Sequence, residues 1–263
     1  MVTIENTIVK RKYIFYILIE KGFNMVQIVK RGFVPKDEIE FGIKWQEVLN
    51  KAGDELFYLL NQGYDMKSSI TFIGNHYLLS KRQRLALARI VSTKEQLKDR
   101  EEKKLDSFMG INKVSIDGFN TIITLEVALS NSLLLAGMDG TIRDMAGLRG
   151  TYHVIDKTEV AIKLILDRIE KLDANEVIFY LDRPVSNSGI LKECILNISE
   201  NYNFKTEVVV IHDVDRVLEK LEGVITSDAI ILDKCISWFN LNKCIVNENI
   251  SNPWMFNLTI RGT

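Results

Sequence analysis

Hydrophobic positions in the first third of the chain recur at steps of three and four residues, which is the spacing of one helix face. One such set predicts a long helix that is capped near Gly63, and its members are Phe41, Trp45, Val48, Ala52, Leu56 and Leu59. A second helix is expected over residues 67–77. A third is expected from Ser80, since Ser80 and Gln83 have the spacing of a capping box. This part of the chain is therefore predicted to be a small all-helical domain.

Beyond residue 106, short apolar runs alternate with amphipathic stretches. Strands are expected at 113–117, 133–139, 176–182, 207–213 and 224–228, with helices near 121–130, 158–172, 189–201, 214–221 and 229–238. Such alternation predicts an α/β fold, a parallel sheet flanked by helices. Residues 94–106 are nearly all charged and are expected to form a solvated linker or a protruding helix. The predicted division is 25–105 for the helical domain with its linker and 106–263 for the α/β domain.

The overall charge places few limits on function. The 263 residues include 34 Lys+Arg and 35 Asp+Glu, so any attraction to nucleic acid must come from a local patch. The three cysteines form no C-x-x-C pair and the histidines are scattered singly, so we expect no zinc motif. A reduced, cytoplasmic setting fits this cysteine usage best; the cysteines are Cys194, Cys235 and Cys244.

Residues 1–24 form an extension of uncertain role. A basic triplet at 10–12 precedes an apolar run at 13–19, which is similar to the start of a signal peptide. Glu20 ends the run, no small-residue cleavage site follows, and the run is far shorter than the roughly 20 residues that span a bilayer. We therefore expect no membrane attachment.

An aspartate ends each of the five expected strands. These residues are Asp117, Asp139, Asp182, Asp213 and Asp228. Ligands of open parallel sheets bind at the carboxyl ends of the strands, so several carboxylates could meet at one edge. Carboxylates that share a site need a cation to stay ionised, and a hard ion such as Mg²⁺ or Mn²⁺ is the natural partner. Aspartate is also a favoured helix N-cap, so each of these residues has an ordinary structural alternative.

The sequences around three of these aspartates have further features. Ile116-Asp117-Gly118-Phe119-Asn120, Tyr180-Leu181-Asp182 and Val224-Ile225-Thr226-Ser227-Asp228 occur in this order. Together they resemble the PIN-like nucleases, especially their NYN branch, over residues of about 111–240. The resemblance implies a metal-dependent ribonuclease in which Asp117, Asp182 and Asp228 are catalytic metal ligands. It implies that Asn120 orients Asp117 or a substrate phosphate, and it makes Glu126 an additional acid, unless Glu126 is a solvated helical residue.

Two loops add candidate substrate contacts. The first begins Asp139-Gly140-Thr141-Ile142-Arg143-Asp144 and continues to Arg149, and its arginines could bind phosphate in a bidentate manner. Asp139 is also a candidate metal ligand. The second runs from Asp182 to Gly189 ahead of a helix, where backbone amides and hydroxyls can hold an anion. Loop and N-cap chemistry explains its serines equally well. The candidate substrate contacts are Asn120, Arg143, Asp144, Arg149, Arg183, Ser186, Ser188, Thr226 and Ser227.

The helical half also has a family resemblance. Arg31-Gly32-Phe33-Val34-Pro35, Leu59-Leu60-Asn61-Gln62-Gly63-Tyr64 and Gly74-Asn75-His76-Tyr77, together with the two loops, resemble an uncharacterised two-domain family. In that family, domain of unknown function 434 is joined to a PIN-like C-terminal domain. The third helix offers a basic face that can contact RNA, although surface helices are commonly charged. Its basic residues are Lys81, Arg82, Arg84 and Arg89.

The leading hypothesis is a divalent-metal-dependent ribonuclease that hydrolyses phosphodiesters. The alternative is a non-catalytic RNA- or protein-binding module of the same fold, favoured if only one or two of Asp117, Asp182 and Asp228 converge. A third hypothesis is phosphotransfer, because Asp139-Gly140-Thr141 is similar to the haloacid dehalogenase signature. In that signature the nucleophilic aspartate would stand at Gly137, where this chain has none. The chain has no P-loop, dinucleotide fingerprint or nucleophile elbow.

Overall fold

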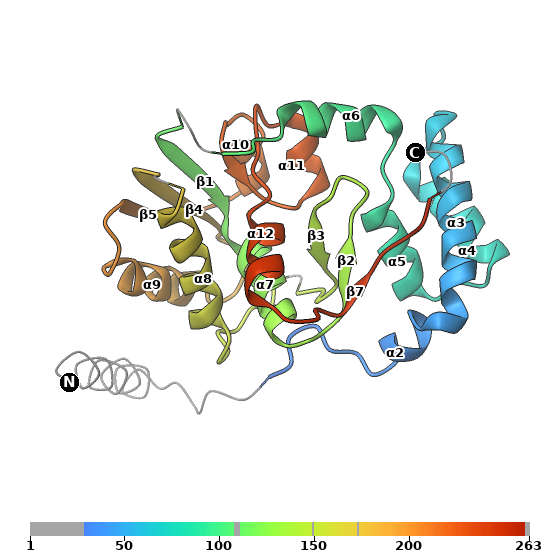
Figure 1. Ribbon diagram of the computed structural model, residues 1–263, viewed down its shortest axis with the longest axis horizontal. Helices are drawn as coiled ribbons and strands as arrows, with labels where there is room; N and C mark the ends of the chain where they lie inside the picture. Colours follow the sequence, from blue (N-terminus) through green and yellow to red (C-terminus); the bar gives the residue numbers. More distant parts are fainter. Residues whose placement is uncertain (1–28, 108–110, 149, 173, 261–263) are drawn as a thin grey trace.

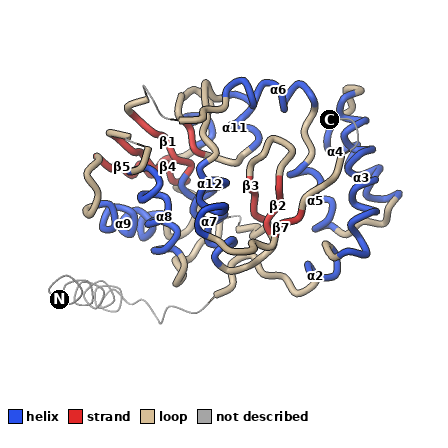
Figure 2. Tube along the Cα trace, viewed as in Figure 1, coloured by secondary structure: helices blue, strands red, loops and turns tan. Residues whose placement is uncertain are grey.

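The computed structural model describes residues 29–107, 111–148, 150–172 and 174–260. The extension expected over residues 1–24 lies outside these ranges. In the described part, helices gather at one end of the molecule, and two small sheets with their covering helices form the rest (Figures 1 and 2). No helix of the described ranges is both long and apolar enough to cross a membrane.

The first third of the chain is helical, as its hydrophobic spacing predicts. Its helices are α2 (Asp37–Glu40), α3 (Ile43–Asn61), α4 (Met66–His76), α5 (Lys81–Ile90) and α6 (Lys94–Lys103). Gly63 lies just beyond the end of α3, has a φ of +88° and donates its N–H to Leu60 O at 3.0 Å. The capping box at the start of α5 is present, with Ser80 and Gln83 exchanging side-chain-to-backbone hydrogen bonds.

The second half contains a four-stranded parallel sheet in the order β5-β4-β1-β6. Its strands are β1 (Lys113–Asp117), β4 (Glu176–Asp182), β5 (Lys205–Ile211) and β6 (Val224–Ile225). β1 and β4 end at the predicted residues, and β5 ends two residues earlier than expected. The connecting helices are α7 (Gly118–Leu129), α8 (Thr158–Glu170), α9 (Ser188–Ser199), α10 (Val214–Leu218), α11 (Ala229–Lys234) and α12 (Leu241–Asn249).

Both faces of this sheet are covered, which explains the continuous apolar run over residues 177–181 of β4. Side chains alternate along β4: Val177 and Phe179 pack in the core formed with α7, α8, α9 and α12. Ile178 and Tyr180 pack on the opposite face in a smaller cluster with α10, α11 and Trp238. The sheet therefore has helices on both sides, and its carboxyl edge remains the place where the strand-end side chains can meet.

A second sheet contains β2 (Leu134–Ala136), β3 (Ile142–Asp144) and β7 (Met255–Phe256) in the order β3-β2-β7. The prediction that residues 133–139 form a strand of the parallel sheet is wrong, because β2 belongs to this second sheet. The chain turns back after β2, with Gly137 N donating to Thr141 O at 2.9 Å and Gly140 at a φ of +77°, so β3 pairs antiparallel to β2. A tight turn replaces the helical crossover that a parallel partner requires.

This second sheet joins the two halves of the molecule, and it lies between them in Figure 1. Leu135 and Phe256 pack into the same core as α3 and α5, whereas Leu134 and Ile142 pack into the core of the α/β half. The N-terminal helices therefore share their core with residues far beyond position 106.

The charged segment expected as a solvated linker or protruding helix forms α6, which runs across the molecule from the helical half to α11 (Figure 1). Most of its charges are exposed, but the side chain of Arg100 is only 1% exposed. The indole Nε1 of Trp238 donates to Arg100 O at 2.7 Å. The segment is thus packed along part of its length, which its charge-rich sequence does not indicate.

Candidate functional site

Asp117 lies at the centre of the carboxyl edge of the parallel sheet. It ends β1, the strand between β4 and β6, and it is buried. The chain turns directly into α7 at Gly118, where a Cβ atom would lie 2.5 Å from Leu181 Cδ2 and 3.0 Å from Tyr180 O. The glycine after Asp117 therefore allows the close approach of α7 to β4 that fixes the aspartate in this position.

Asp117 is held by residues of the Thr226-Ser227-Asp228 motif. Thr226 Oγ1 donates to Asp117 Oδ2 at 2.8 Å and accepts from Asp228 N at 3.0 Å. Asn120 Oδ1 accepts from Ser227 N at 2.8 Å and from Ser227 Oγ at 2.9 Å. Because a backbone N–H can only donate, these bonds assign the carbonyl oxygen of Asn120 and leave its Nδ2 amide as the donor on the other side. The two separate sequence motifs form one hydrogen-bonded unit.

Asp117 and Asp228 belong to this unit, and two further acids lie near it. We call these four residues the acidic group: Asp117, Asp182, Asp215 and Asp228. Asp182 ends β4, and Asp228 is the N-cap of α11, where its Oδ1 accepts from Ile230 N at 2.8 Å. Asp215 is in the first turn of α10, beyond β5. The strand-end aspartate expected here, Asp213, is instead the N-cap residue of α10 with a φ of +57°, and both Asp213 and Asp215 are exposed.

The pKa values of three members of the acidic group are raised. Burial, together with the charges of Asp228, Asp182 and Asp215, raises the pKa of Asp117 to about 8, although the Thr226 hydroxyl opposes the shift. Desolvation also raises the pKa of Asp215, with added repulsion from Asp228 and Asp182. The pKa of Asp182 is raised mainly by burial and then by Asp213. With a pKa of about 8, Asp117 is largely protonated at neutral pH, because burial and the neighbouring acids oppose its ionisation.

The spacing of these carboxylates limits how they could bind an ion. Within the described ranges, no three His, Cys, Asp or Glu side chains come close enough together to hold a metal ion between them. Oxygen ligands alone fit Mg²⁺ or Mn²⁺, and Mg²⁺ in proteins commonly uses one or two carboxylates, several waters and substrate phosphates. The donor chemistry of the acidic group fits that mode of binding rather than an all-protein cage.

Asp139, a candidate metal ligand, belongs to a separate buried ion network. It accepts from Arg100 at 2.7 Å, from Arg143 at 2.5 Å and from Thr141 Oγ1 at 2.6 Å. Burial raises its pKa, but the two arginines and the Thr141 hydroxyl outweigh that effect, so its pKa is lowered overall. The carboxylate of Asp139 is therefore balanced by protein cations and is not brought into the acidic group.

The same network holds the backbone on both sides of Asp228. Arg143 Nε donates to Ser227 O at 2.7 Å, and Arg100 NH2 contacts Ala229 O at 3.4 Å. Arg100 also forms an ion pair with Asp233 of α11 at 2.6 Å. A helix of the N-terminal half and a strand of the second sheet thus fix the position of one member of the acidic group.

Glu126, the additional acid, faces away from this site into another buried network. Its Oε2 accepts from Arg31 at 2.9 Å, and its Oε1 accepts from the Tyr152 hydroxyl at 2.8 Å and from Thr158. Arg31 also donates to His153 O at 2.5 Å. These contacts attach the segment before α2 to α7, so in this structure Glu126 has a packing role.

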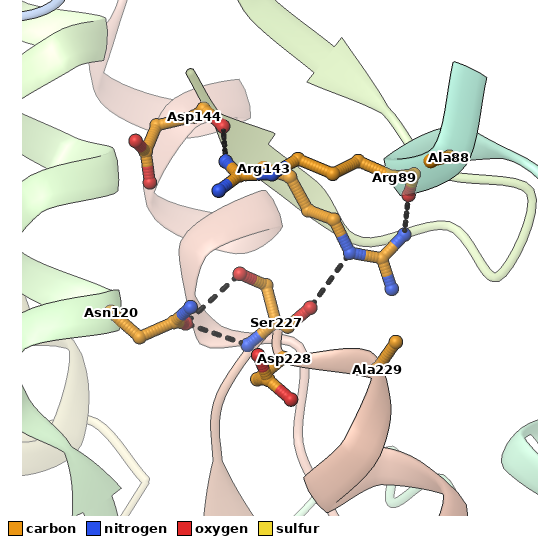
Figure 3. A pocket seen from close by; sticks show the side chains of 8 residues that line it. All are labelled: Ala88, Arg89, Asn120, Arg143, Asp144, Ser227, Asp228 and Ala229. Carbon is orange, nitrogen blue, oxygen red and sulfur yellow. Dashed lines mark hydrogen bonds between the residues drawn. The ribbon is translucent and has the colours of Figure 1, made fainter. Parts of the chain in front are cut away.

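A pocket of about 160 Å³ opens next to the acidic group (Figure 3). Asn120 and Asp228 belong to both the pocket wall and the hydrogen-bonded surroundings of Asp117. The wall also includes predicted contacts of the first loop and residues of α5. The lining residues are Ala88, Arg89, Asn120, Arg143, Asp144, Ser227, Asp228 and Ala229.

The predicted substrate contacts thus fall into two sets. Asn120, Arg143, Asp144 and Ser227 meet at the pocket, and Thr226 lies beside them on Asp117. The remaining predicted substrate contacts lie in the second loop or outside the described residues. Arg183 is exposed, Ser188 begins α9, and Ser186 Oγ bonds Tyr152 N at 3.0 Å and Tyr152 O at 3.1 Å, while Arg149 lies outside the described residues.

The basic face expected on α5 is largely used within the protein. Arg82 forms an ion pair with buried Asp37 at 2.5 Å. Arg84 donates to Gly74 O at 2.7 Å and Leu79 O at 2.9 Å, around the end of α4. Lys81 is exposed, and Arg89 reaches the pocket. Of the four basic residues, Arg89 is the one placed at the candidate site.

Comparison with known proteins places the chain in a family. Residues 106–244 match the family described as Domain of unknown function (DUF5616), and the chain belongs to it. Residues 48–103 match Protein of unknown function (DUF434), as the front-half motifs indicate. The chain is 34% identical over 186 residues to the Uncharacterized protein MJ0935 of Methanocaldococcus jannaschii, covering 70% of this chain and 88% of that protein. No solved structure matches the chain significantly.

Breaking the buried ion network should destabilise the protein strongly. We expect Arg100→Gln to lower the free energy of unfolding by about 3 kcal/mol, because Asp233 and Asp139 each lose a buried cationic partner. Lys98→Gln on the same helix removes an exposed ion pair with Glu102 and should cost less than about 0.5 kcal/mol. Urea denaturation of both variants measures the difference, and equal losses would show that Arg100 has no special role in stability.

The raised pKa of Asp117 predicts a pH dependence of stability. Between about pH 4 and pH 8 the folded protein keeps a proton on Asp117 that the unfolded chain releases, given a pKa of about 8 against 3.8. The free energy of unfolding should therefore fall as pH rises through this range, by at most about 1.4 kcal/mol per pH unit.

Asp117→Asn should remove most of this fall, because an amide resembles the protonated carboxyl and does not ionise. Denaturation in a chelating buffer at several pH values tests this expectation. Asp99→Asn, which alters an exposed aspartate of α6, should keep the wild-type dependence. The same pH dependence in the wild type and in Asp117→Asn would contradict the assignment.

Proposed function

We propose that this chain is a divalent-metal-dependent ribonuclease that hydrolyses phosphodiester bonds at the acidic group. The observation that carries the proposal is the position of Asp117, a buried carboxyl group at the carboxyl edge of a parallel sheet. Its pKa is raised first by burial and then by three neighbouring acids. Such an arrangement costs stability in the folded protein. A cation bound beside Asp117 and Asp228 would offset that cost, and this is typical of a functional rather than a structural site.

Further support comes from the way the motifs combine. The Asp-Gly-Phe-Asn segment and the Thr-Ser-Asp segment resemble the corresponding motifs of the PIN-like and NYN nucleases. They are hydrogen-bonded to one another through Asn120, Thr226 and Ser227. An ordinary N-cap aspartate accepts hydrogen bonds only from backbone N–H groups of its own helix. Asp117 also accepts from the Thr226 hydroxyl, which belongs to the other motif. The link between the motifs favours a shared role at one site.

The residues have distinct tasks in the proposed reaction. Asp117 and Asp228 would hold Mg²⁺ or Mn²⁺, with Asp182 and Asp215 contributing negative charge nearby. When bound, the ion would lower the pKa of water for attack on phosphorus and balance charge on the phosphoryl oxygens. Thr226 fixes Asp117 through its hydroxyl, and Asn120 presents its Nδ2 amide beside the pocket.

The alternative is a non-catalytic RNA- or protein-binding module of the same fold. It is favoured by the absence, within the described ranges, of three carboxylates at mutual ligand distance. In this alternative the acidic group would be a surface for a basic partner and would not need an ion. Metal binding and cleavage distinguish the two functions directly.

The test is a calorimetric titration of Mn²⁺ into the wild type and into the Asp117→Asn/Asp228→Asn double variant, followed by a cleavage assay on labelled single-stranded RNA. Both substitutions keep the shape of the side chain, and asparagine is itself a good N-cap, so the fold should be retained. We expect saturable binding and ion-dependent cleavage by the wild type. The double variant should lose both, with cleavage at least about 100-fold slower.

Asp99→Asn is the matched control, because it removes one aspartate charge from an exposed position on α6. It should bind Mn²⁺ and cleave RNA as the wild type does. Cleavage by the double variant at the wild-type rate would refute the site. RNA binding by the wild type without any ion-dependent cleavage would favour the non-catalytic module.

A further inference from the structure

The pocket beside the acidic group is built by both halves of the chain. Arg89 reaches it from α5, in the segment that matches the DUF434 family, and Asn120 and Asp228 reach it from α7 and α11 (Figure 3). Arg143 and Asp144 complete it from β3 in the second sheet. A ligand in this pocket would therefore contact the helical half and a carboxylate of the acidic group at the same time.

The two arginines of the pocket differ in how their donors are used. Each of the three guanidinium nitrogens of Arg143 has a partner in the protein: Nε donates to Ser227 O and NH1 to Arg89 O, each at 2.7 Å, and NH2 forms an ion pair with Asp139. Arg89 donates through NH1 to Asp144 O, a neutral carbonyl. Across the described ranges, no carboxylate forms an ion pair with Arg89. A half-buried guanidinium in a pocket thus lacks an anionic partner from the protein.

We infer that Arg89 binds a phosphate of a single-stranded polynucleotide, so that the helical half supplies part of the substrate site. This inference rests on the proposed function, which brings a phosphodiester chain to the acidic group. The planar guanidinium offers donors matched to phosphate oxygens. The Nδ2 amide of Asn120 lies on the same pocket wall as a second donor.

Charge also favours a diester phosphate over a free phosphate ion. Asp144 and Asp228 line the pocket with Arg89, so a compact dianion would meet repulsion there. A phosphodiester carries a single negative charge and is anchored by neighbouring nucleotides outside the pocket. The pocket therefore fits one phosphate of a longer strand that continues past Asp228.

Fluorescence anisotropy tests this with labelled oligouridylate and oligothymidylate as probes, in a chelating buffer that prevents hydrolysis. We expect Arg89→Ala to weaken binding of the strand by about tenfold and to lower the slope of log K against log salt by about one. Lys81→Ala is the matched control, since Lys81 is an exposed cation of the same helix outside the pocket. Its affinity and salt slope should remain near those of the wild type.

Arg89→Lys keeps the positive charge but lacks the planar guanidinium. It is the second test variant if thermal unfolding shows that Arg89→Ala does not fold. It should keep the wild-type salt slope while weakening binding. Similar losses for RNA and DNA would support the phosphate as the recognised group, whereas a loss confined to RNA would overturn the phosphate contact.

Equal affinity of the wild type and Arg89→Ala would overturn the inference, and so would failure of the wild type to bind either strand. The outcome is separable from that of the proposed function. RNA cleavage with no dependence on Arg89 would leave the ribonuclease proposal intact and remove this contact. Binding that depends on Arg89 without cleavage in Mn²⁺ would support this contact and contradict the ribonuclease proposal.

Discussion

The buried carboxylate of Asp139, shared by Arg100 and Arg143, is the interaction on which the arrangement of this protein depends. Arg100 comes from the N-terminal half, Arg143 from the second sheet, and both also contact backbone carbonyls beside Asp228. Burying three charges is costly, and mutual pairing recovers that cost only when the geometry is good. One ion network therefore joins the two halves and fixes the strand-end loop on which Asp228 lies.

The acidic group shows the opposite electrostatic design. Asp139 is balanced by two cations and its pKa is lowered, whereas Asp117 has a hydroxyl as its side-chain donor and its pKa is raised to about 8. Both carboxylates are buried, so the difference comes from their partners rather than from desolvation alone. Asp139, the carboxylate that joins the two halves, is paired with two arginines, whereas no ion pair to Asp117 forms among the described residues. That contrast is the main reason to regard Asp117 as functional.

Sequence patterns predict much of the fold and part of the site. The bounds of β1 and β4 are predicted to the residue, and for β4 the reason is its continuous apolar run, which is typical of a buried parallel strand. The turn after β2 is not predicted, since a short apolar run does not reveal whether its partner is parallel or antiparallel. β7, two residues long, has too little pattern to detect.

For the candidate site, too, the sequence indicates local motifs but not contacts between residues far apart in the chain. The pairing of Asn120 with Ser227 unites two motifs that are recognisable locally, but the sequence offers no means of seeing that Arg100 neutralises Asp139 from 39 residues away. Asp215 is missed because β5 ends two residues before the expected Asp213, which moves the relevant acid into the first turn of α10. Charge balance is a tertiary property, so strand-end aspartates with different partners look alike in the sequence.

The most direct test of this account is a titration of the aspartate carboxyl groups by ¹³C NMR, with Asp117→Asn used to assign the signal of Asp117. The account predicts that one carboxyl resonance titrates near pH 8, and that it is missing from the variant. It also predicts that adding Mg²⁺ moves this titration to lower pH, because a bound cation favours the ionised form. If every aspartate titrates below about pH 5 and Mg²⁺ has no effect, Asp117 has no raised pKa and the acidic group binds no ion.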